Sequence, residues 1–80
     1  MNATANAESV DIGSTVTYTE SATGDHRTVH IVISGESDPM HGLLSEESPV
    51  GRALLGHRAG ELVLFKVPRG ERHLRIDSVH

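Results

Sequence analysis

Apolar residues occupy every second position in four separate stretches of the sequence, and this alternation restricts the fold more than any other feature. A period of two is typical of β-strands that bury one face, and β-branched residues in these stretches also favour strands. We therefore expect four strands whose inward residues are Val16 and Tyr18 in 15–19, Val29, Ile31 and Ile33 in 27–34, Val63, Phe65 and Val67 in 62–67, and Leu74 and Ile76 in 72–79.

The segments between these stretches are rich in turn-forming residues and set the order of the elements. Residues 21–25 and 68–71 each contain glycine among other turn-forming residues, so each is expected to close a hairpin. Residues 35–42 carry no apolar period and are expected to form a loop. A short strand at 43–45 is expected to follow it.

One helix is expected, and it begins at Pro49. The Ser48 side chain can accept a hydrogen bond from the free amides of a first turn, and proline at the next position loses no helical hydrogen bond. Apolar residues at helical spacing in 50–55 give this helix one face that can lie across a sheet. Gly51 inside the helix costs about 1 kcal/mol relative to alanine, so either a close backbone approach or a poorly optimised position explains it.

These elements fit a single small domain. Eighty residues without cysteine allow one core that packing alone must stabilise, and 36% hydrophobic residues suffice to build it. Residues 1–9 carry no apolar period and are expected to form a flexible leader, so that the domain spans 10–80. The expected fold class is α+β, with a twisted antiparallel sheet of four to five strands and one short helix packed on it.

Composition and charge disfavour several classes of function. No apolar run approaches the roughly 20 residues that cross a bilayer, and no secretory signal is visible, so we expect a cytoplasmic protein without a membrane partner. The net charge is -4, with -7 in residues 1–47 and +3 in residues 48–80, and Tyr18 and Phe65 are the only aromatic residues. Nucleic-acid binders usually present a basic surface with stacking aromatic residues, so sequence-specific binding of nucleic acid is not expected.

The residues that could carry chemistry form no recognisable catalytic or metal-binding motif. The six histidines show no close pair on a helix and no zinc spacing, so surface histidines without a metal are expected. The carboxylates of Glu36, Asp38 and Glu46 could suggest acid–base catalysis, but no deep pocket is predicted to hold them. We therefore expect neither an enzyme nor a bound cofactor.

Several motifs, in their order and spacing, resemble one protein family. They are SPVGRALLG at 48–56, GE at 60–61, VPRGE at 67–71, VDIGSTV at 10–16 and GESD at 35–38. The C-terminal domain of the bacterial GreA/GreB transcript-cleavage factors is similar, with a Ser-Pro, an Arg-Ala-Leu-Leu-Gly type helix, a Gly-Asp turn and a Pro-x-Gly-Glu hairpin. The resemblance covers about residues 10–79 of this sequence.

The resemblance implies an FKBP-like fold that docks on bacterial RNA polymerase at the rim of the secondary channel. In full-length family members an N-terminal coiled coil reaches down this channel, and acids at its tip help to hold the metal ion that cleaves backtracked RNA. Nine irregular residues precede Val10 in this sequence, so we expect a monomeric binding module that modulates transcription without stimulating cleavage by itself. The sequence leaves open whether the chain is a naturally short protein or a fragment. It also leaves open whether the chain activates or inhibits transcription.

The resemblance and the local chemistry together point to one partner-binding surface. Glu47, Ser48 and Pro49 match the loop by which the family contacts polymerase, with Glu47 at a position where Asp or Asn is more usual. A carboxylate beside a proline-fixed helix start is a rigid acceptor for a lysine or arginine of a partner, although capping alone would also explain Ser48. The other expected contact residues are Glu36, Asp38 and Glu46, which would form an acidic rim, and Arg52, for which a salt bridge to Glu46 or Glu47 is the alternative.

Two other functions remain as alternatives. FKBP-like domains include peptidyl-prolyl isomerases, which bind proline in a pocket lined by aromatic side chains, whereas Tyr18 and Phe65 lie on separate predicted strands. A generic interaction domain is the second alternative, with Leu62 and Leu64 on the outward face of their strand as a surface for self-association. Neither alternative needs RNA polymerase.

Overall fold

The computed structural model describes residues 9–80, and its element order is the one expected. The bounds are β1 Thr15–Glu20, β2 His26–Val32, the 3-10 turns η1 Ser34–Glu36 and η2 Pro39–His41, β3 Leu43–Ser45, α2 Pro49–Leu54, β4 Leu62–Val67 and β5 Gly70–Val79. Most of the expected leader 1–9 lies outside the described residues, but its last residue, Ser9, forms an isolated antiparallel bridge with Arg58. Within residues 9–80 no helix is long and apolar enough to cross a membrane.

All five strands belong to one sheet, in the order β3-β2-β1-β5-β4. The pairs β1–β2, β1–β5 and β4–β5 are antiparallel, and both expected hairpins are confirmed. The β2–β3 pair is parallel, so the sheet is mixed rather than wholly antiparallel as expected. The physical reason is that the loop with η1 and η2 carries the chain back before β3 begins, as a parallel pair requires.

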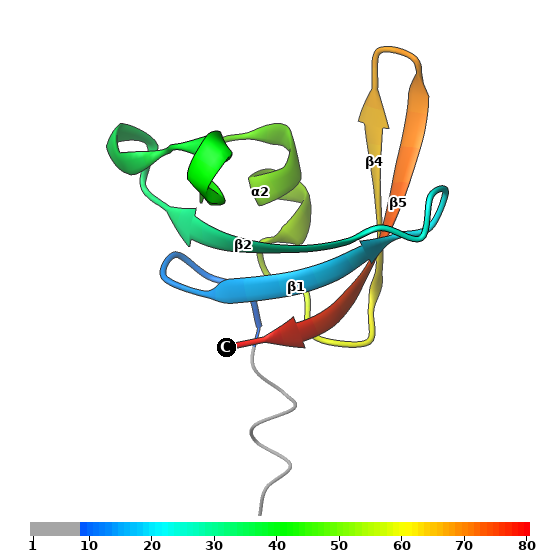
Figure 1. Cartoon of the computed structure of the whole chain (residues 1–80), viewed down its shortest axis with the longest axis horizontal. Helices are drawn as coiled ribbons and strands as arrows, with labels where there is room; N and C mark the ends of the chain where they lie inside the picture. Colours follow the sequence, from blue (N-terminus) through cyan, green and yellow to red (C-terminus); the bar gives the residue numbers. More distant parts are fainter. Residues whose placement is uncertain (1–8) are drawn as a thin grey trace, which may run out of the picture.

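The sheet is sharply bent, and β5 carries the bend. Residues 70–75 of β5 pair with β4, whereas residues 74–79 pair with β1. The register with β1 shifts between Thr17 and Tyr18, because Asp77 has no partner of its own there, and such a bulge bends a strand and increases its twist. Figure 1 shows the β4–β5 hairpin standing steeply against β1 and β2.

Helix α2 lies in the hollow of the bent sheet and closes the core (Figure 1). Its Leu54 is fully buried, and burying a leucine side chain contributes about 1.5–3 kcal/mol. Two of the predicted inward residues do not join the core. Ile33 is 49% exposed because β2 ends at Val32 and the chain turns into η1, and Val67, the last residue of β4, is only half-buried. The buried apolar residues of the core are Val10, Val16, Tyr18, Val29, Ile31, Leu54, Val63, Leu74, Ile76 and Val79.

Gly51 is buried where α2 meets the end of β3. A Cβ atom at this position would lie 2.1 Å from the carbonyl oxygen of Ser45, a separation that real side chains essentially never show. Of the two explanations for a glycine inside this helix, the close backbone approach is therefore the one the structure supports. Without a side chain at this position, the first turn of the helix can lie directly on the strand that precedes it.

Candidate functional site

We call residues 46–49, between β3 and α2, the corner. The helix begins directly after Ser48, as expected, and the Ser48 hydroxyl accepts a hydrogen bond from the Gly51 amide at 3.0 Å. The same hydroxyl donates to the Ser45 carbonyl at 2.8 Å, and the Glu47 amide donates to the Ser45 hydroxyl at 2.9 Å. Ser48 is therefore both the helix cap and a link between helix and strand, which holds the corner in one conformation.

The corner is open to solvent and negatively charged. Glu47 and Pro49 are exposed, whereas Glu46 and Ser48 are half-buried. The Glu46 carboxylate accepts a hydrogen bond from the Ser34 hydroxyl at 3.4 Å, which joins the corner to the start of η1. None of the ion pairs within residues 9–80 involves Glu46 or Glu47, so no cation of the described chain neutralises these two acids.

The other expected contact residues lie around the same edge strand, β3. Glu36 is exposed in η1, and Asp38 bonds through its backbone to Leu43, the first residue of β3. The Asp38 carboxylate lies 2.7 Å from Nδ1 of His41. Arg52 is exposed on α2, and no acid within residues 9–80 forms an ion pair with it, so the alternative salt bridge to the corner is not found. The four acids thus occupy the segments directly before and after β3.

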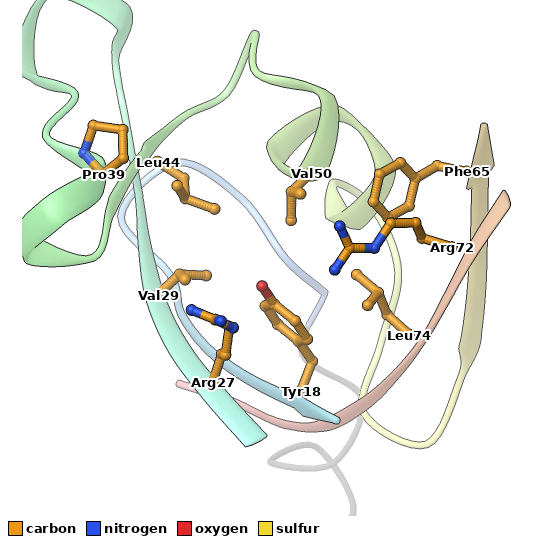
Figure 2. A pocket seen from close by; sticks show the side chains of 9 residues that line it. All are labelled: Tyr18, Arg27, Val29, Pro39, Leu44, Val50, Phe65, Arg72 and Leu74. Atoms are coloured by element: carbon orange, nitrogen blue, oxygen red, sulfur yellow. The ribbon is translucent and has the colours of Figure 1, made fainter. Parts of the chain in front are cut away.

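A pocket that the sequence did not predict lies on the concave face of the sheet, beside α2 (Figure 2). It has a volume of about 330 Å³. Tyr18 and Phe65 lie on separate strands, as expected, but both line this one pocket. The apolar wall consists of Val29, Pro39, Leu44, Val50, Phe65 and Leu74.

Three polar side chains reach the pocket from inward positions of the strands. Tyr18 on β1 and Arg27 on β2 are direct cross-strand partners, and Arg72 comes from β5. Arg27 alternates in phase with the buried Val29, and Arg72 alternates in phase with the buried Leu74. A cation in the inward phase of a strand is therefore the signal in the sequence by which the pocket could have been found.

The electrostatics of the pocket are set by one ion pair and one phenol. The almost buried Glu20 carboxylate binds the Arg72 guanidinium, and this hydrogen bond raises the pKa of Arg72. Burial raises the pKa of Tyr18, although the positive charge of Arg27 acts in the opposite direction. Tyr18 therefore stays protonated near neutral pH and can donate a hydrogen bond. No carboxylate of residues 9–80 forms an ion pair with Arg27.

Five of the six histidines are exposed and His57 is half-buried. Within residues 9–80 no hydrogen bond joins two of their side chains. His26 and His30 share hydrogen bonds with threonine hydroxyls at 2.8 Å. His41, His57 and His73 each lie beside one carboxylate. In the described part of the chain, no three His, Asp or Glu side chains are arranged to hold a metal ion. The geometry of these residues therefore gives no support to a metal centre.

Comparison with known proteins points to a single family. The family described as "Transcription elongation factor, GreA/GreB, C-term" has a sequence model that matches residues 5–80. Transcription elongation factor GreA of Listeria welshimeri is 40% identical over 70 residues, which cover 88% of this chain and 44% of the relative. GreA of Bacillus cytotoxicus is 43% identical over 70 residues, which again cover 88% of this chain and 44% of the relative.

Solved structures lead to the same family. Gfh1 of Thermus aquaticus superposes with a TM-score of 0.80 at 33% identity, covering 91% of this chain and 48% of that chain. The GreA/GreB factor from Nitrosomonas europaea superposes with a TM-score of 0.68 at 28% identity, covering 85% of this chain and 57% of that chain. This chain spans about half the length of the relatives it matches. From the match over residues 5–80 and the shared fold, the chain belongs to the GreA/GreB family of transcription elongation factors and corresponds to their C-terminal domain.

Proposed function

We propose that this chain is a docking module that binds bacterial RNA polymerase through the corner, at the rim of the secondary channel, and thereby modulates transcription. One observation carries the proposal: the exposed Glu47 carboxylate stands on a rigid helix start and has no cation within residues 9–80 as a partner. Membership in the GreA/GreB family supplies the partner. The domain acts as a monomer in this proposal.

Rigidity of the corner favours binding, because a surface that is already ordered loses fewer conformations when a partner arrives. The Ser48 hydroxyl bonds the helix and the strand together, and the absence of a side chain at Gly51 lets them touch. Of the corner, only the Glu47 side chain then has to become ordered when the partner binds. A charge-assisted hydrogen bond from a lysine or arginine of the polymerase to this carboxylate is roughly twice as strong as a neutral one.

The acids around β3 add a longer-range effect. Glu36, Asp38 and Glu46 surround the corner with negative charge, which raises the rate of encounter with a basic ridge more than it raises affinity. Salt shortens the range of this attraction to about 10 Å at 0.1 M ionic strength. Arg52, exposed beside the corner, is proposed to contact an acid of the polymerase.

We propose no cleavage-stimulating activity for this chain by itself. Within residues 9–80 the one α-helix is the six-residue α2, and these residues therefore hold no helical hairpin that could carry acids into a channel. An RNA-cleavage assay on backtracked polymerase complexes measures this directly. Cleavage above the intrinsic rate of the polymerase, at saturating chain, would contradict this part of the proposal.

Capture of bacterial core RNA polymerase by the immobilised chain tests the docking surface. Glu47→Lys reverses one exposed charge and disturbs no buried contact, and we expect it to weaken capture about threefold to tenfold. Glu71→Lys makes the same change of charge at an exposed position on the β4–β5 hairpin and is the matched control. Equal capture by the two variants would remove the corner from the binding surface.

The pocket favours a second candidate function, because it brings Tyr18 and Phe65 together as a peptidyl-prolyl isomerase requires. Two exposed guanidinium groups, from Arg27 and Arg72, also line this pocket and distinguish it from a purely aromatic one. An isomerisation assay on a proline-containing tetrapeptide decides the matter. Rate acceleration that disappears in Phe65→Ala would establish the isomerase.

A further inference from the structure

We propose that the outer edge of β4 pairs with the same strand of a second copy of this chain, so that two sheets join into one. Strand β4 lies at one end of the sheet, and within residues 9–80 it pairs only with β5. The second copy would run antiparallel to the first, with Leu64 opposite Leu64 of the second copy. No residue of the corner belongs to β4, so this inference stands apart from docking on RNA polymerase.

Every second residue of β4 turns its backbone N–H and C=O groups away from the sheet. The Ile76 amide donates to the Glu61 carbonyl at 3.0 Å, so the backbone of Glu61 faces β5. Successive residues of an antiparallel strand alternate between its two sides, so the odd-numbered residues of β4 also face β5. The even-numbered residues therefore present their backbone groups at the outer edge, and these residues are Leu62, Leu64 and Lys66.

These three residues determine how two copies would align. Residues whose backbone groups face each other in an antiparallel pair exchange two hydrogen bonds. With Leu64 opposite its own copy, Leu62 meets Lys66 of the second copy, and all three residues are paired. A shift of two positions in one direction places Lys66 opposite Gly60, whose amide already bonds to β5. The reverse shift places Leu62 opposite Pro68, which has no amide hydrogen.

The side chains on the convex face favour the same alignment. Leu62 and Leu64 are 72% and 55% exposed, and pairing gathers them with the leucines of the second copy. The hydrocarbon stem of Lys66 can cover Leu62 of the second copy while its ammonium group stays in water. Burial of this apolar surface favours association, and no like charges are placed opposite each other.

Strand β4 lacks the features that usually keep a sheet edge from pairing. Prolines, several charges or a bulge commonly protect such edges. Lys66 is the only charged residue of β4, the strand holds no proline, and its register with β5 continues without a shift. The other edge strand, β3, has only three residues, and all of them are half-buried. The edge of β4 is therefore the better template for a second strand.

The pairing is expected to be weak and reversible. Stable protein interfaces bury about 1,200–2,000 Å² in total, more than one edge of a short strand supplies. We expect a dissociation constant of about 0.1–1 mM. The chain is then a monomer at micromolar concentrations, which is the form proposed to dock on RNA polymerase.

Disulfide cross-linking tests the alignment, because the natural chain contains no cysteine. In Leu64→Cys the two Cα atoms would lie about 5.5 Å apart across the pair, within the range of a disulfide. In the matched variant Leu62→Cys they would lie about 13 Å apart, which is too far. At about 0.5 mM chain we expect Leu64→Cys to form the oxidised dimer at least about tenfold faster. Random collisions would favour the more exposed position 62, so equal rates or a faster Leu62→Cys would overturn the proposal.

Sedimentation equilibrium from about 10 µM to about 1 mM chain tests the association itself. Leu64→Lys places two cations opposite each other and should weaken the dimer at least about tenfold. Ile12→Lys makes the same change at an apolar residue that is 49% exposed outside β4, and it should keep the dimer.

Three results would overturn the proposal. They are a monomer at every concentration, which would leave the edge of β4 to a different protein, a dimer that survives in Leu64→Lys, and an equal loss in Ile12→Lys. Leu64→Lys should leave capture of RNA polymerase unchanged, whereas Glu47→Lys should leave the dimer unchanged. Failure of one proposal is thereby distinguishable from failure of the other.

Discussion

The concave face of the sheet buries apolar side chains under α2, whereas the convex face presents hydrogen-bonded threonine, histidine and aspartate side chains to solvent. Both faces come from the same alternating strands, one from each phase of the alternation. The convex phase also carries Leu62 and Leu64, which are 72% and 55% exposed. The side chains on the concave face stabilise the fold because α2 covers them. The side chains on the convex face remain exposed, so a wide range of residues is acceptable there.

Truncating one leucine on each face of the β4–β5 hairpin should give the largest contrast. Leu74 is 2% exposed on the concave face, and Leu74→Ala is expected to lower the free energy of unfolding by about 2–5 kcal/mol. Leu64 is 55% exposed on the convex face, and Leu64→Ala should change it by no more than about 0.5 kcal/mol. Urea unfolding followed by circular dichroism measures both. A comparable loss in the two variants would mean that Leu64 is covered, for example by a second copy of the chain.

A glycine-to-alanine change in the helix that covers the concave face should give the next largest effect. Alanine normally stabilises a helix by about 1 kcal/mol relative to glycine. At position 51 the new Cβ would meet the Ser45 carbonyl, so Gly51→Ala is expected to destabilise the fold by about 1–3 kcal/mol instead.

Gly35 provides the matched control for this change of sign. Nothing lies within 4 Å of a Cβ built at Gly35, and its backbone conformation is open to other residues. Gly35→Ala should therefore leave the unfolding midpoint unchanged or raise it slightly, because the unfolded chain loses freedom. A stabilised Gly51→Ala variant would show that the first turn of α2 moves away from β3 at little cost.

The sequence predicted the parts of the fold that depend on neighbours along the chain. Alternation identified the strands, and Ser48 followed by proline identified the start of α2, because capping and strand periodicity are local effects. The parallel β2–β3 pair and the bulge at Asp77 were not predicted, since each depends on residues far apart in the sequence. Ile33 was misplaced because the strand ends one residue earlier than its apolar period.

The two candidate sites also differ in whether they depend on neighbouring residues or on residues far apart in the sequence. The corner is formed by consecutive residues, so its helix start and its acids could be read from 46–49 alone, whereas its choice as a partner-binding surface came from the family resemblance. The pocket needs Tyr18, Arg27 and Arg72 to meet from three strands, so it exists only in the folded sheet. The sequence signal for the pocket was that both arginines occupy inward positions of their strands. This signal becomes informative only when the strand bounds are known.

The smallest predicted effect concerns Asp77, at the bulge on the convex face. Its carboxylate accepts a hydrogen bond from the Thr19 hydroxyl at 2.6 Å and another from Arg75 Nε at 3.2 Å. These hydrogen bonds lower the pKa of Asp77, and the bond from Thr19 has the largest effect. Burial acts in the opposite direction. The Thr19 hydroxyl has one proton and donates it to Asp77. Nδ1 of His26 lies 2.8 Å from the Thr19 oxygen, so this nitrogen must be the donor and the Thr19 oxygen the acceptor.

Thr19→Val removes the hydroxyl and should raise the pKa of Asp77 toward its ordinary value. A carboxyl group whose pKa is lower in the folded chain stabilises the fold above the unfolded pKa, about 3.9, and loses that contribution as the pH falls through the folded pKa. The variant should therefore lose stability near neutral pH and show a shallower decline toward acid. NMR titration of the Asp77 carboxyl carbon measures the pKa, with Thr17→Val as control, because Thr17 bonds to Thr28 on the same face. A pKa that rises equally in both variants would assign the effect to a general loosening of the convex face rather than to the Thr19 hydroxyl.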